Sequence, residues 1–267
     1  MGSVLAWFET RAPSGRRARL AYGVATAIGL PLAWGLLGRL IEAIAPWPLQ
    51  AVALKPTFAG RALLVAGERV EHALECEQLE AALAELPWLV SRPTAGLDAG
   101  LVASAAIESL AENLVDSWLT PLAAYALFGL GGAYAYRAVN TADAMWGYRT
   151  PEYEHLGKAA ARLDDVLNWL PARLGALLLA AVGPRPVASL AIWRHDASLT
   201  ASPNAGQVMA MAAGQLDVRL EKPGHYILHA SGRTPTAREI AAARQLVNRA
   251  MLATVFLCLV MIEARRA

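Results

Sequence analysis

The residues best suited to chemistry in this chain lie between Ile107 and Arg173, where carboxylates, amides and arginines interrupt segments that are otherwise apolar. Ionisable side chains are costly at membrane depth unless they are paired, hydrated or bound to a ligand. A high density of them in such surroundings is therefore a hypothesis for a functional site. Oxygen ligands and guanidinium groups together favour the binding of Mg²⁺ and phosphate.

The first polar cluster, Glu108, Glu112 and Asp116, steps along the chain four residues at a time. On an α-helix each step turns by about 40°, so the carboxylates share one face, and Asn113 lies beside it. Stacked carboxylates repel one another unless a cation lies between them, and Mg²⁺ prefers oxygen ligands. The spacing predicts either a Mg²⁺ site or a buried polar network that locks helices together. In the network, the acids would pair with arginines, for which the candidates are Arg137, Arg162 and Arg173.

A sharper cluster follows further along the chain. Arg162 and Asp165 are three residues apart, and Asp164 and Asn168 are four apart. Side chains at these spacings are neighbours on a helix, and Arg173 comes about one turn later. Adjacent carboxylates with an amide one turn away can hold a metal-bound phosphate, while arginines can bind further phosphate oxygens.

Two other polar groups are weaker signals. Asn140, Asp143 and Tyr148 are expected in a turn just past an apolar segment, where helix-capping residues are common. Ser202 and Asn204 belong to the sequence Ser-Pro-Asn-Ala-Gly, which by itself is typical of a turn.

Four apolar segments could position these groups. Three of them have the ~20 residues that a membrane-spanning helix needs, and the fourth reaches that length only if it is extended back through Leu246 and Val247. The four segments are Leu20–Gly38, Trp118–Tyr136, Leu170–Trp193 and Ala250–Ile262. The third is interrupted by Gly183-Pro184-Arg185-Pro186, which favours a kinked or re-entrant pair of helices. Hydrophobic residues make up 56% of the 267 and charged residues only 17%, with a mean hydropathy of +0.35, which indicates a membrane protein. We expect three or four crossings.

Two segments between the predicted crossings differ from them, one amphipathic and the other rich in Gly and Pro. Ala66–Leu89 has apolar residues in helical register among many glutamates and predicts one amphipathic helix. Ser202–Thr236 is rich in Gly and Pro and predicts loop with short helix or strand, followed by one long helix over Thr236–Ile262. The fold class is therefore all-α, a polytopic integral membrane helical bundle with amphipathic helices and a loop-rich segment near the C-terminus. A single membrane-embedded domain is expected over residues 1–267.

Charge and motif content exclude several partners. A net charge of +2, without a basic run interleaved with aromatics, argues against nucleic acid, whereas membrane lipid is an expected partner. The two cysteines and five histidines form no disulfide framework or zinc pattern, and the glycines at 129–132 are expected to permit close helix packing instead of forming a P-loop. The arginines from Arg11 to Arg19 place the N-terminus in the cytoplasm, and the apolar segments predict a multi-pass protein of the cell membrane.

These clusters, in this order, closely resemble the adenosylcobinamide-phosphate synthase family of cobalamin biosynthesis. The likeness is densest from about Ala95 to Gly206. The motifs that carry it are Glu108-Ser109-Leu110-Ala111-Glu112-Asn113, Asn140-Thr141-Ala142-Asp143, Gly147-Tyr148-Arg149, Ala161-Arg162-Leu163-Asp164-Asp165, Asn168, Pro171-Ala172-Arg173 and Ser202-Pro203-Asn204-Ala205-Gly206.

The resemblance implies an integral ligase of the cytoplasmic membrane of a prokaryote. It would join the propionate of adenosylcobyric acid, a corrinoid, to 1-aminopropan-2-ol or its O-phosphate, using ATP and Mg²⁺. The residues that would hold Mg²⁺ and the nucleotide phosphates are Glu108, Glu112, Asp116, Asp164 and Asp165. Those that would orient the phosphates or bind substrate are Asn113, Asn140, Asp143, Tyr148, Asn168, Ser202 and Asn204, with Arg162 and Arg173 stabilising the transferring phosphate. The catalytic set would be Glu108, Glu112, Asp164, Asp165 and Arg162.

Two other functions stay open. Family members usually begin with an additional segment that contains a Pro-His-Pro motif, and an N-terminal family segment is expected to be missing here. The chain also has Pro93 and Met209 where the family pattern differs. These departures are compatible with a non-catalytic or diverged membrane paralogue. An intramembrane Mg²⁺-dependent prenyl or phospho-alcohol transferase would also use paired aspartates, although a second Asp-rich repeat is missing from the sequence.

Overall fold

A computed structural model describes residues 1–148 and 150–266, without the side chain of Arg266. Arg149, which ends one of the family motifs, therefore lies outside the described residues. Nearly all regular structure is helical, and the one described sheet has two strands, which confirms the all-α prediction. The chain divides into two compact units, which we describe separately. Unit 1 comprises Met1–Phe58, Thr120–Asn168 and the segment from Cys258, and unit 2 comprises Ala59–Leu119 and Trp169–Leu257.

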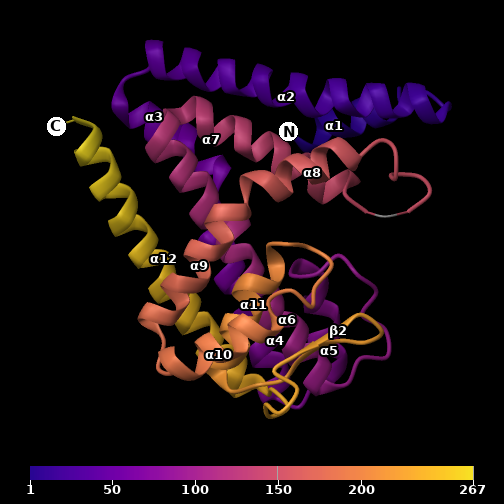
Figure 1. The fold of residues 1–267 in the computed structure, drawn as a ribbon, viewed down its shortest axis with the longest axis vertical. Helices are drawn as coiled ribbons and strands as arrows, with labels where there is room; N and C mark the ends of the chain where they lie inside the picture. The colour runs from indigo at the N-terminus through magenta and orange to yellow at the C-terminus, as the bar shows by residue number, and fades with distance from the viewer. Residues whose placement is uncertain (149, 267) are drawn as a thin grey trace. The chain divides into compact units, whose positions relative to one another are not determined.

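Unit 1 is built on two long helices that pack along each other, α2 and α7 (Figure 1). Its elements are α1 (Gly2–Glu9), α2 (Arg16–Ile44), α3 (Trp47–Leu54), η1 (Lys55–Thr57), α7 (Thr120–Trp146), α8 (Lys158–Leu167) and the end of α12 (Ala237–Arg266). A Cβ on Gly38 of α2 would lie 2.6 Å from the carbonyl oxygen of Leu130, and a Cβ on Gly131 would lie 3.0 Å from that of Gly35. These backbones can approach only because glycines lie between them, which confirms the predicted close packing.

A break interrupts α7 at Gly129, whose φ of 66° and ψ of −160° are not helical. A side chain at Gly129 would collide with the Glu42 carboxylate. Close to the break, Nη1 of Arg265 donates to the carbonyl oxygen of Ala126 at 2.7 Å. A charged side chain from the last helix thus satisfies a backbone acceptor beside a helix break.

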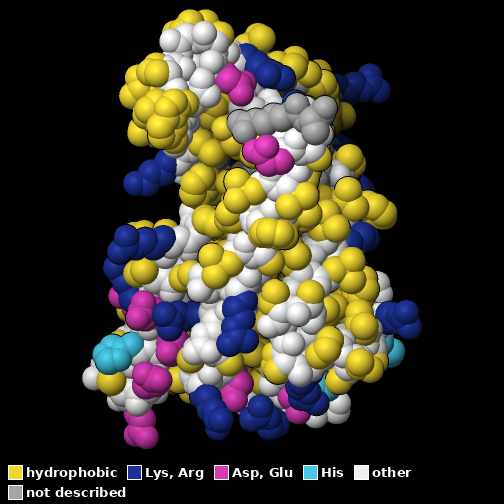
Figure 2. Space-filling view, turned by 90° about the vertical axis from the view of Figure 1, so that its left-hand side faces the viewer, with side chains coloured by type: hydrophobic (Ala, Val, Ile, Leu, Met, Phe, Trp, Pro, Cys, Tyr) yellow, Lys and Arg dark blue, Asp and Glu magenta, His cyan; other side chains and the backbone are white. Residues whose placement is uncertain are grey.

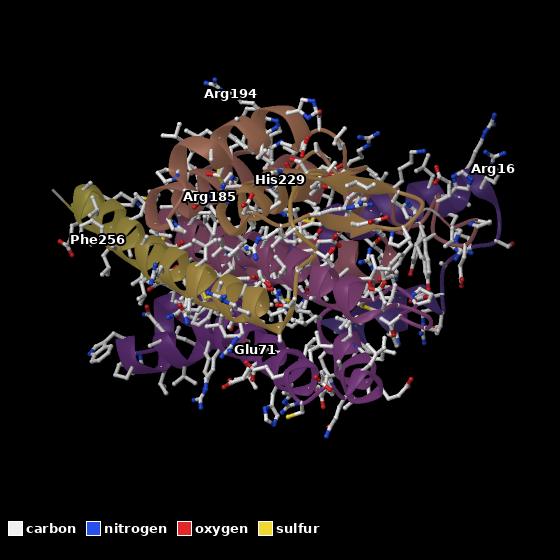
Figure 3. All side chains as sticks on the ribbon, turned by 90° about the horizontal axis from the view of Figure 1, so that it is seen from below. Arg16, Glu71, Arg185, Arg194, His229 and Phe256 are labelled. Carbon is white, nitrogen blue, oxygen red and sulfur yellow. The ribbon has the colours of Figure 1, made fainter. Side chains whose placement is uncertain are left out.

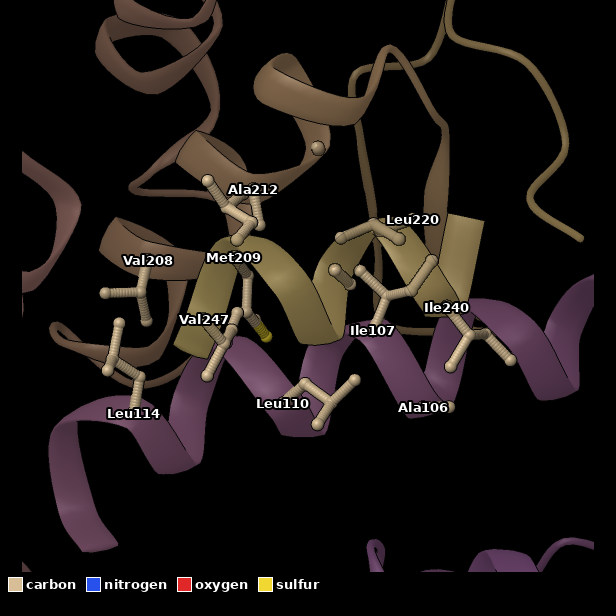
Figure 4. Packing of buried hydrophobic residues seen from close by; sticks show 14 of the residues in the cluster. Ala106, Ile107, Leu110, Leu114, Val208, Met209, Ala212, Leu220, Ile240 and Val247 are labelled. Carbon is tan, nitrogen blue, oxygen red and sulfur yellow. The ribbon is translucent and has the colours of Figure 1, made fainter. Parts of the chain in front are cut away.

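Unit 2 packs several helices and a β-hairpin around helix α6. Its elements are α4 (Gly60–Glu75), α5 (Leu79–Glu85), η2 (Leu86–Trp88), α6 (Ala99–Leu114), the π-helical η3 (Val115–Leu119), α9 (Trp169–Val182), α10 (Pro186–Asp196), α11 (Ala205–Leu216), β1 (Leu220–Lys222), β2 (Tyr226–Leu228) and most of α12. Apolar side chains of α6, α11 and α12 meet in its core (Figure 4). They include Ile107, Leu110, Leu114, Val208, Met209, Ala212, Ile240 and Val247.

In the part of the chain that the structure describes, three helical segments are long and apolar enough to cross a membrane: Arg16–Ile44, Ala99–Trp146 and Ala237–Arg265. A fourth candidate exists if Lys158–Leu167 and Trp169–Val182 are one broken span. The face drawn in Figure 2 carries broad hydrophobic areas between groups of charged side chains. Many large apolar side chains are exposed on the candidate spans, as expected for surfaces that face lipid.

The predicted third crossing, Leu170–Trp193, is partly wrong. The helix ends at Val182 and resumes at Pro186, as the Gly-Pro-Arg-Pro sequence indicates, but the second half is not part of any candidate span. Gln215 stabilises the break, because its side-chain oxygen accepts a hydrogen bond from the backbone N–H of Arg185 at 2.8 Å. The predicted long helix over Thr236–Ile262 is confirmed by α12.

The prediction of one helix over Ala66–Leu89 is wrong, because α4 ends at Glu75 and α5 begins at Leu79. Glu77 adopts a left-handed conformation with φ of 57°. The N–H groups of Glu77 and Gln78 donate to the carbonyls of Leu74 and Ala73, which is the Schellman pattern of a helix C-terminus. The left-handed position is usually Gly, so a glutamate there gives no sequence signal.

The loop-rich segment contains α11 and the antiparallel β1–β2 hairpin, as predicted. Asp217 follows the last residue of α11 in a left-handed conformation, and its carboxylate binds the side chains of Arg185 and His229. These two partners are labelled in Figure 3. The hydrogen bond from His229, and then that from Arg185, hold the pKa of Asp217 below its usual value. His229 also donates its backbone N–H to Asp196 at 2.5 Å, so the end of the hairpin is tied to α10.

Candidate functional site

In unit 1 a buried carboxylate, Asp164, is held by two amides. Nδ2 of Asn168 donates to Oδ2 of Asp164 at 2.9 Å, and Nδ2 of Asn140 lies 3.4 Å from Oδ1. Asn168 ends α8 one turn after Asp164, which is the pairing that the four-residue spacing predicts. Asn140 comes from α7. The structure therefore brings together three of the predicted site residues.

The two amides are themselves oriented by neighbours. Oδ1 of Asn168 accepts hydrogen bonds from the hydroxyls of Thr120, at 2.7 Å, and Tyr136, at 3.0 Å. Oδ1 of Asn140 accepts from Nη1 of Arg137 at 3.1 Å. Because each amide oxygen is occupied in this way, the amide N–H groups are left to face Asp164. The Asp164 cluster is thus a preorganised acceptor whose direct partners are neutral.

The expected turn at Asn140 and Asp143 is wrong. Helix α7 continues to Trp146, so both residues lie inside it, and the backbone N–H of Gly147 donates to the carbonyl of Asp143 at 2.6 Å. Ala138, Ala142 and Ala144 around them are strong helix formers, which favours continuation of the helix. Tyr148 does lie in the loop that follows, as expected.

Tyr148, Arg162 and Asp165 line one pocket of about 310 Å³ in unit 1. Arg162 approaches Asp165 at 4.0 Å, and most of the Arg162 side chain is exposed. The predicted grouping of Arg162 and Asp165 on one face of a helix is confirmed. Asp164, next in the chain, is buried at 8% exposure and belongs to the neighbouring amide cluster.

In unit 2 a second buried carboxylate, Glu108, accepts from three donors. Ser104 donates to Oε1 at 3.2 Å, and both Arg92 and the hydroxyl of Tyr226 donate to Oε2 at 3.2 Å. Burial, and then the negative charges of Glu108 and Glu112, raise the pKa of Tyr226, so its hydroxyl stays a donor. The Glu108 cluster joins α6 to the hairpin and to the segment before α6.

The arginine that pairs with Glu108 is Arg92, not Arg137, Arg162 or Arg173 as the network alternative expected. Ser104 also accepts the backbone N–H of Glu221 at 2.7 Å, which fixes the first strand of the hairpin beside α6. Arg92 and Tyr226 lie 16 and 118 residues from Glu108 in the chain, so helical spacing could not identify them.

The other acids of the first cluster are arranged differently from Glu108. Glu112 is exposed and Asp116 is partly buried. Asp116 lies in the π-helical segment that begins at Val115, where the uniform α-helical step assumed for it does not hold. Asn113 donates to the carbonyl of Ser109 at 3.1 Å and lines a separate pocket of about 430 Å³ in unit 2.

Arg173, Ser202 and Asn204 have local partners in unit 2. Arg173 donates to the carbonyl of Trp169 at 2.6 Å, and its guanidinium lies 4.1 Å from the centre of the indole ring. Asn204 is the N-cap residue of α11, and the Ser202 hydroxyl accepts its backbone N–H at 3.2 Å. The predicted turn is confirmed, and the roles of these three residues in substrate binding stay predictions.

Within the described residues, no three Asp, Glu, His or Cys side chains are grouped to hold a metal. Mg²⁺ often uses only one or two carboxylates together with water and substrate phosphates. Each oxygen of Asp164 accepts one amide hydrogen bond and retains a lone pair, whereas Oε2 of Glu108 already accepts two donors. The donor set at Asp164 therefore fits a Mg²⁺–phosphate ligand better than that at Glu108.

A family model and individual relatives all relate the chain to the same family of proteins. The model of the CobD/Cbib protein family matches residues 1–254. The chain is 39% identical to a cobalamin biosynthesis protein CobD of Dehalococcoides mccartyi, over 94% of this chain and 85% of that protein. It is 37% identical to a probable cobalamin biosynthesis protein CobD of Methanothrix thermoacetophila (94% and 76%) and to the CobD protein of Mycobacterium tuberculosis (87% and 79%). No solved structure matches the chain.

Proposed function

The chain belongs to the CobD/Cbib family of cobalamin biosynthesis proteins, and from that membership we propose that it is an ATP-dependent acid–amine ligase. The proposed reaction joins the free propionate of adenosylcobyric acid to the amine of 1-aminopropan-2-ol or its O-phosphate, giving adenosylcobinamide or its phosphate. The candidate membrane spans support a location in the cytoplasmic membrane.

The observation that carries the proposal is the Asp164 cluster. Asp164 is a buried carboxylate that accepts hydrogen bonds from the neutral amides of Asn140 and Asn168. Its negative charge is therefore available to a cationic ligand, and we propose that Asp164 holds a Mg²⁺ ion that accompanies the phosphates of ATP. Bound there, Mg²⁺ would neutralise phosphate charge.

A propionate is a poor electrophile, so amide formation requires that one carboxylate oxygen be converted to a leaving group. We propose that this oxygen takes the γ-phosphoryl group of ATP, with ADP leaving. The neutral amine nitrogen then attacks the carbonyl carbon, the bond from that carbon to the phosphate oxygen breaks, and the departing phosphate takes the proton that the nitrogen loses. In this scheme the protein contributes mainly positioning and electrostatics. The amides of Asn140 and Asn168 fix the Asp164 carboxylate, while Thr120, Tyr136 and Arg137 fix the amides.

The direct test uses the purified full-length protein in lipid nanodiscs with adenosylcobyric acid, the amine, ATP and Mg²⁺. We expect a product whose mass corresponds to the amide, formed only when ATP is present, and formation of ADP in equal amount. Product formation without nucleotide would contradict the proposed activation.

A second test separates the ligase from a non-catalytic paralogue. A strain that lacks the cobinamide-forming step should grow without added cobinamide when it expresses this protein. Failure to grow, with the protein accumulating in membranes and with no amide formed in nanodiscs, would favour the paralogue.

A further inference from the structure

The connection between α1 and α2 in unit 1 gathers positive charge at the start of a candidate membrane span. Residues 1–24 contain four arginines and a single acidic side chain, that of Glu9. The four are Arg11, Arg16, Arg17 and Arg19, and the span Arg16–Ile44 begins at the second of them. Cations at the end of a span lie at the level of the lipid headgroups, where anionic phosphates are the complementary charge.

The positive charge of these arginines is not neutralised within the chain. Among the described residues, none of the four forms an ion pair with a carboxylate. Arg11, Arg16 and Arg17 are exposed, and Arg16 commits only its Nε, which donates to Nε2 of His155 at 2.9 Å. Nε of Arg19 is buried and has no hydrogen-bond partner in the described chain. A buried donor of this kind calls for a partner from outside the chain, such as water or an anion.

An exposed tryptophan fixes the position of the first arginine. The guanidinium of Arg11 lies 3.7 Å from the centre of the Trp7 ring, and its Nη1 donates to the Trp7 carbonyl at 3.1 Å. Trp7 is 52% exposed. Tryptophan rings concentrate at the interface between membrane and water. The stacked pair therefore holds the Arg11 charge at the level of the headgroups.

Helix α1 is anchored beside these arginines by hydrogen bonds to other segments. The two carboxylate oxygens of Glu9 accept from Nε1 of Trp146, at 3.1 Å, and from the hydroxyl of Tyr153, at 2.8 Å. The hydroxyl of Tyr22, in α2, donates to the carbonyl of Phe8 at 2.8 Å. The arginines are thus presented by a preorganised pair of helices, which lowers the cost of binding a ligand.

An exposed apolar ridge continues from the arginines along α2. Leu20, Val24 and Ile28 follow Arg16 in steps of four residues and are 40%, 40% and 55% exposed. Residues four apart are neighbours on a helix surface, so the ridge runs from the cation into the candidate span. A cation at the head of an apolar ridge matches a molecule that has an anionic head and an acyl chain.

We propose that the start of α2, together with α1, is a binding site for an anionic phospholipid. The headgroup phosphate accepts hydrogen bonds from Arg16 and Arg17, and Arg11 adds positive charge beside it. One acyl chain lies along the ridge that begins at Leu20. A choline headgroup brings its own positive charge, which the arginines repel, so the site selects lipids with net negative charge. This inference does not depend on the proposed ligase function.

The test is equilibrium binding of radiolabelled lipid to the full-length protein in dodecyl maltoside. The probes are phosphatidylglycerol and phosphatidylcholine with identical acyl chains. We expect phosphatidylglycerol to bind about tenfold more tightly, and Arg16→Gln and Arg17→Gln each to lower this ratio about fivefold. Raising the ionic strength should also lower the ratio for the unmodified protein. Equal affinity of the unmodified protein for the two lipids would overturn the proposal.

A matched control lies at the other end of the same helix. Arg39→Gln removes an arginine that is 62% exposed but already pairs with Glu42 at 3.4 Å, so it should leave the ratio unchanged. Thermal unfolding of each variant verifies that it is folded, and a ratio insensitive to salt would contradict the proposal even if a variant failed to fold.

Two further outcomes would assign the arginines to other roles. If both glutamine variants retain the preference for phosphatidylglycerol, the arginines serve only to orient the helix in the membrane and the proposal is wrong. If inorganic phosphate or ATP displaces phosphatidylglycerol, the arginines bind a soluble phosphate compound and the lipid assignment is wrong.

Discussion

Asp164 in unit 1 and Glu108 in unit 2 are both buried carboxylates, but their neighbours carry different charges. Glu108 forms an ion pair with Arg92 and also accepts from Tyr226 and Ser104. Among the ion pairs of the described residues, none includes Asp164, and its donors are two amides. Removing one partner of a buried ion pair leaves an uncompensated charge, so Glu108 is committed to Arg92, whereas a carboxylate held by neutral donors keeps its charge for a ligand.

This contrast also distinguishes a Mg²⁺ site from a buried structural network, two interpretations that the sequence alone supports equally. The residues of both clusters have the types and spacing of a metal site, and also those of a structural network. The geometry favours the network at Glu108 and the ligand site at Asp164. Substitutions at the two positions should therefore affect different properties of the protein.

The largest expected effect is on catalysis at Asp164. Asp164→Asn removes the charge but retains the size of the side chain, so we expect the turnover number for amide formation to fall at least about a hundredfold. The protein should accumulate in membranes at normal levels. The measurement is ATP-dependent product formation in nanodiscs, and unchanged turnover would remove Asp164 from the proposed mechanism. Asp98→Asn, at the N-cap of α6, is a matched control that should retain turnover.

The next effect is on stability at Glu108. Glu108→Gln leaves the partly buried Arg92 without its carboxylate, which should lower the free energy of unfolding by about 3 kcal/mol. The double variant Glu108→Gln with Arg92→Gln should recover part of this loss, because it no longer buries an unpaired charge. Denaturant unfolding in mild detergent measures both. A Glu108→Gln protein with full stability and no turnover would reverse our assignment of the two clusters.

The smallest effect concerns Tyr226. Tyr226→Phe removes the hydroxyl that donates to Glu108 and should lower stability by about 1 kcal/mol. Because the folded-state pKa of Tyr226 is raised, its contribution is fully present below the unfolded pKa of about 10 and is lost as pH rises through the folded value. The difference between the two proteins should be constant from pH 6 to 9 and shrink above pH 10. A difference that grew above pH 10 would contradict this hydrogen-bond assignment.

Much of the fold could be predicted from the sequence because apolar length is a local signal. The spans around α2 and α12 follow from the length of their apolar segments. The Asp164–Asn168 pair follows from another local signal, the four-residue spacing of two polar residues on a helix. The break at Glu77 could not be predicted, since the left-handed position carries a glutamate. Partners distant in sequence were also missed: Arg92 and Tyr226 at Glu108, and Glu9 at Trp146 and Tyr153. Such contacts depend on tertiary packing, and neither periodicity nor motif order encodes them.

The hydrogen bond from Arg265 to the carbonyl of Ala126 has a consequence for biogenesis. The two residues are 139 positions apart, and Arg265 is synthesised well after Ala126. A backbone carbonyl beside the broken part of α7 must therefore enter the bilayer before its final donor has left the ribosome. Hydrocarbon cannot solvate that group, so during insertion it requires a temporary donor such as water, a lipid headgroup or a residue of the translocation machinery.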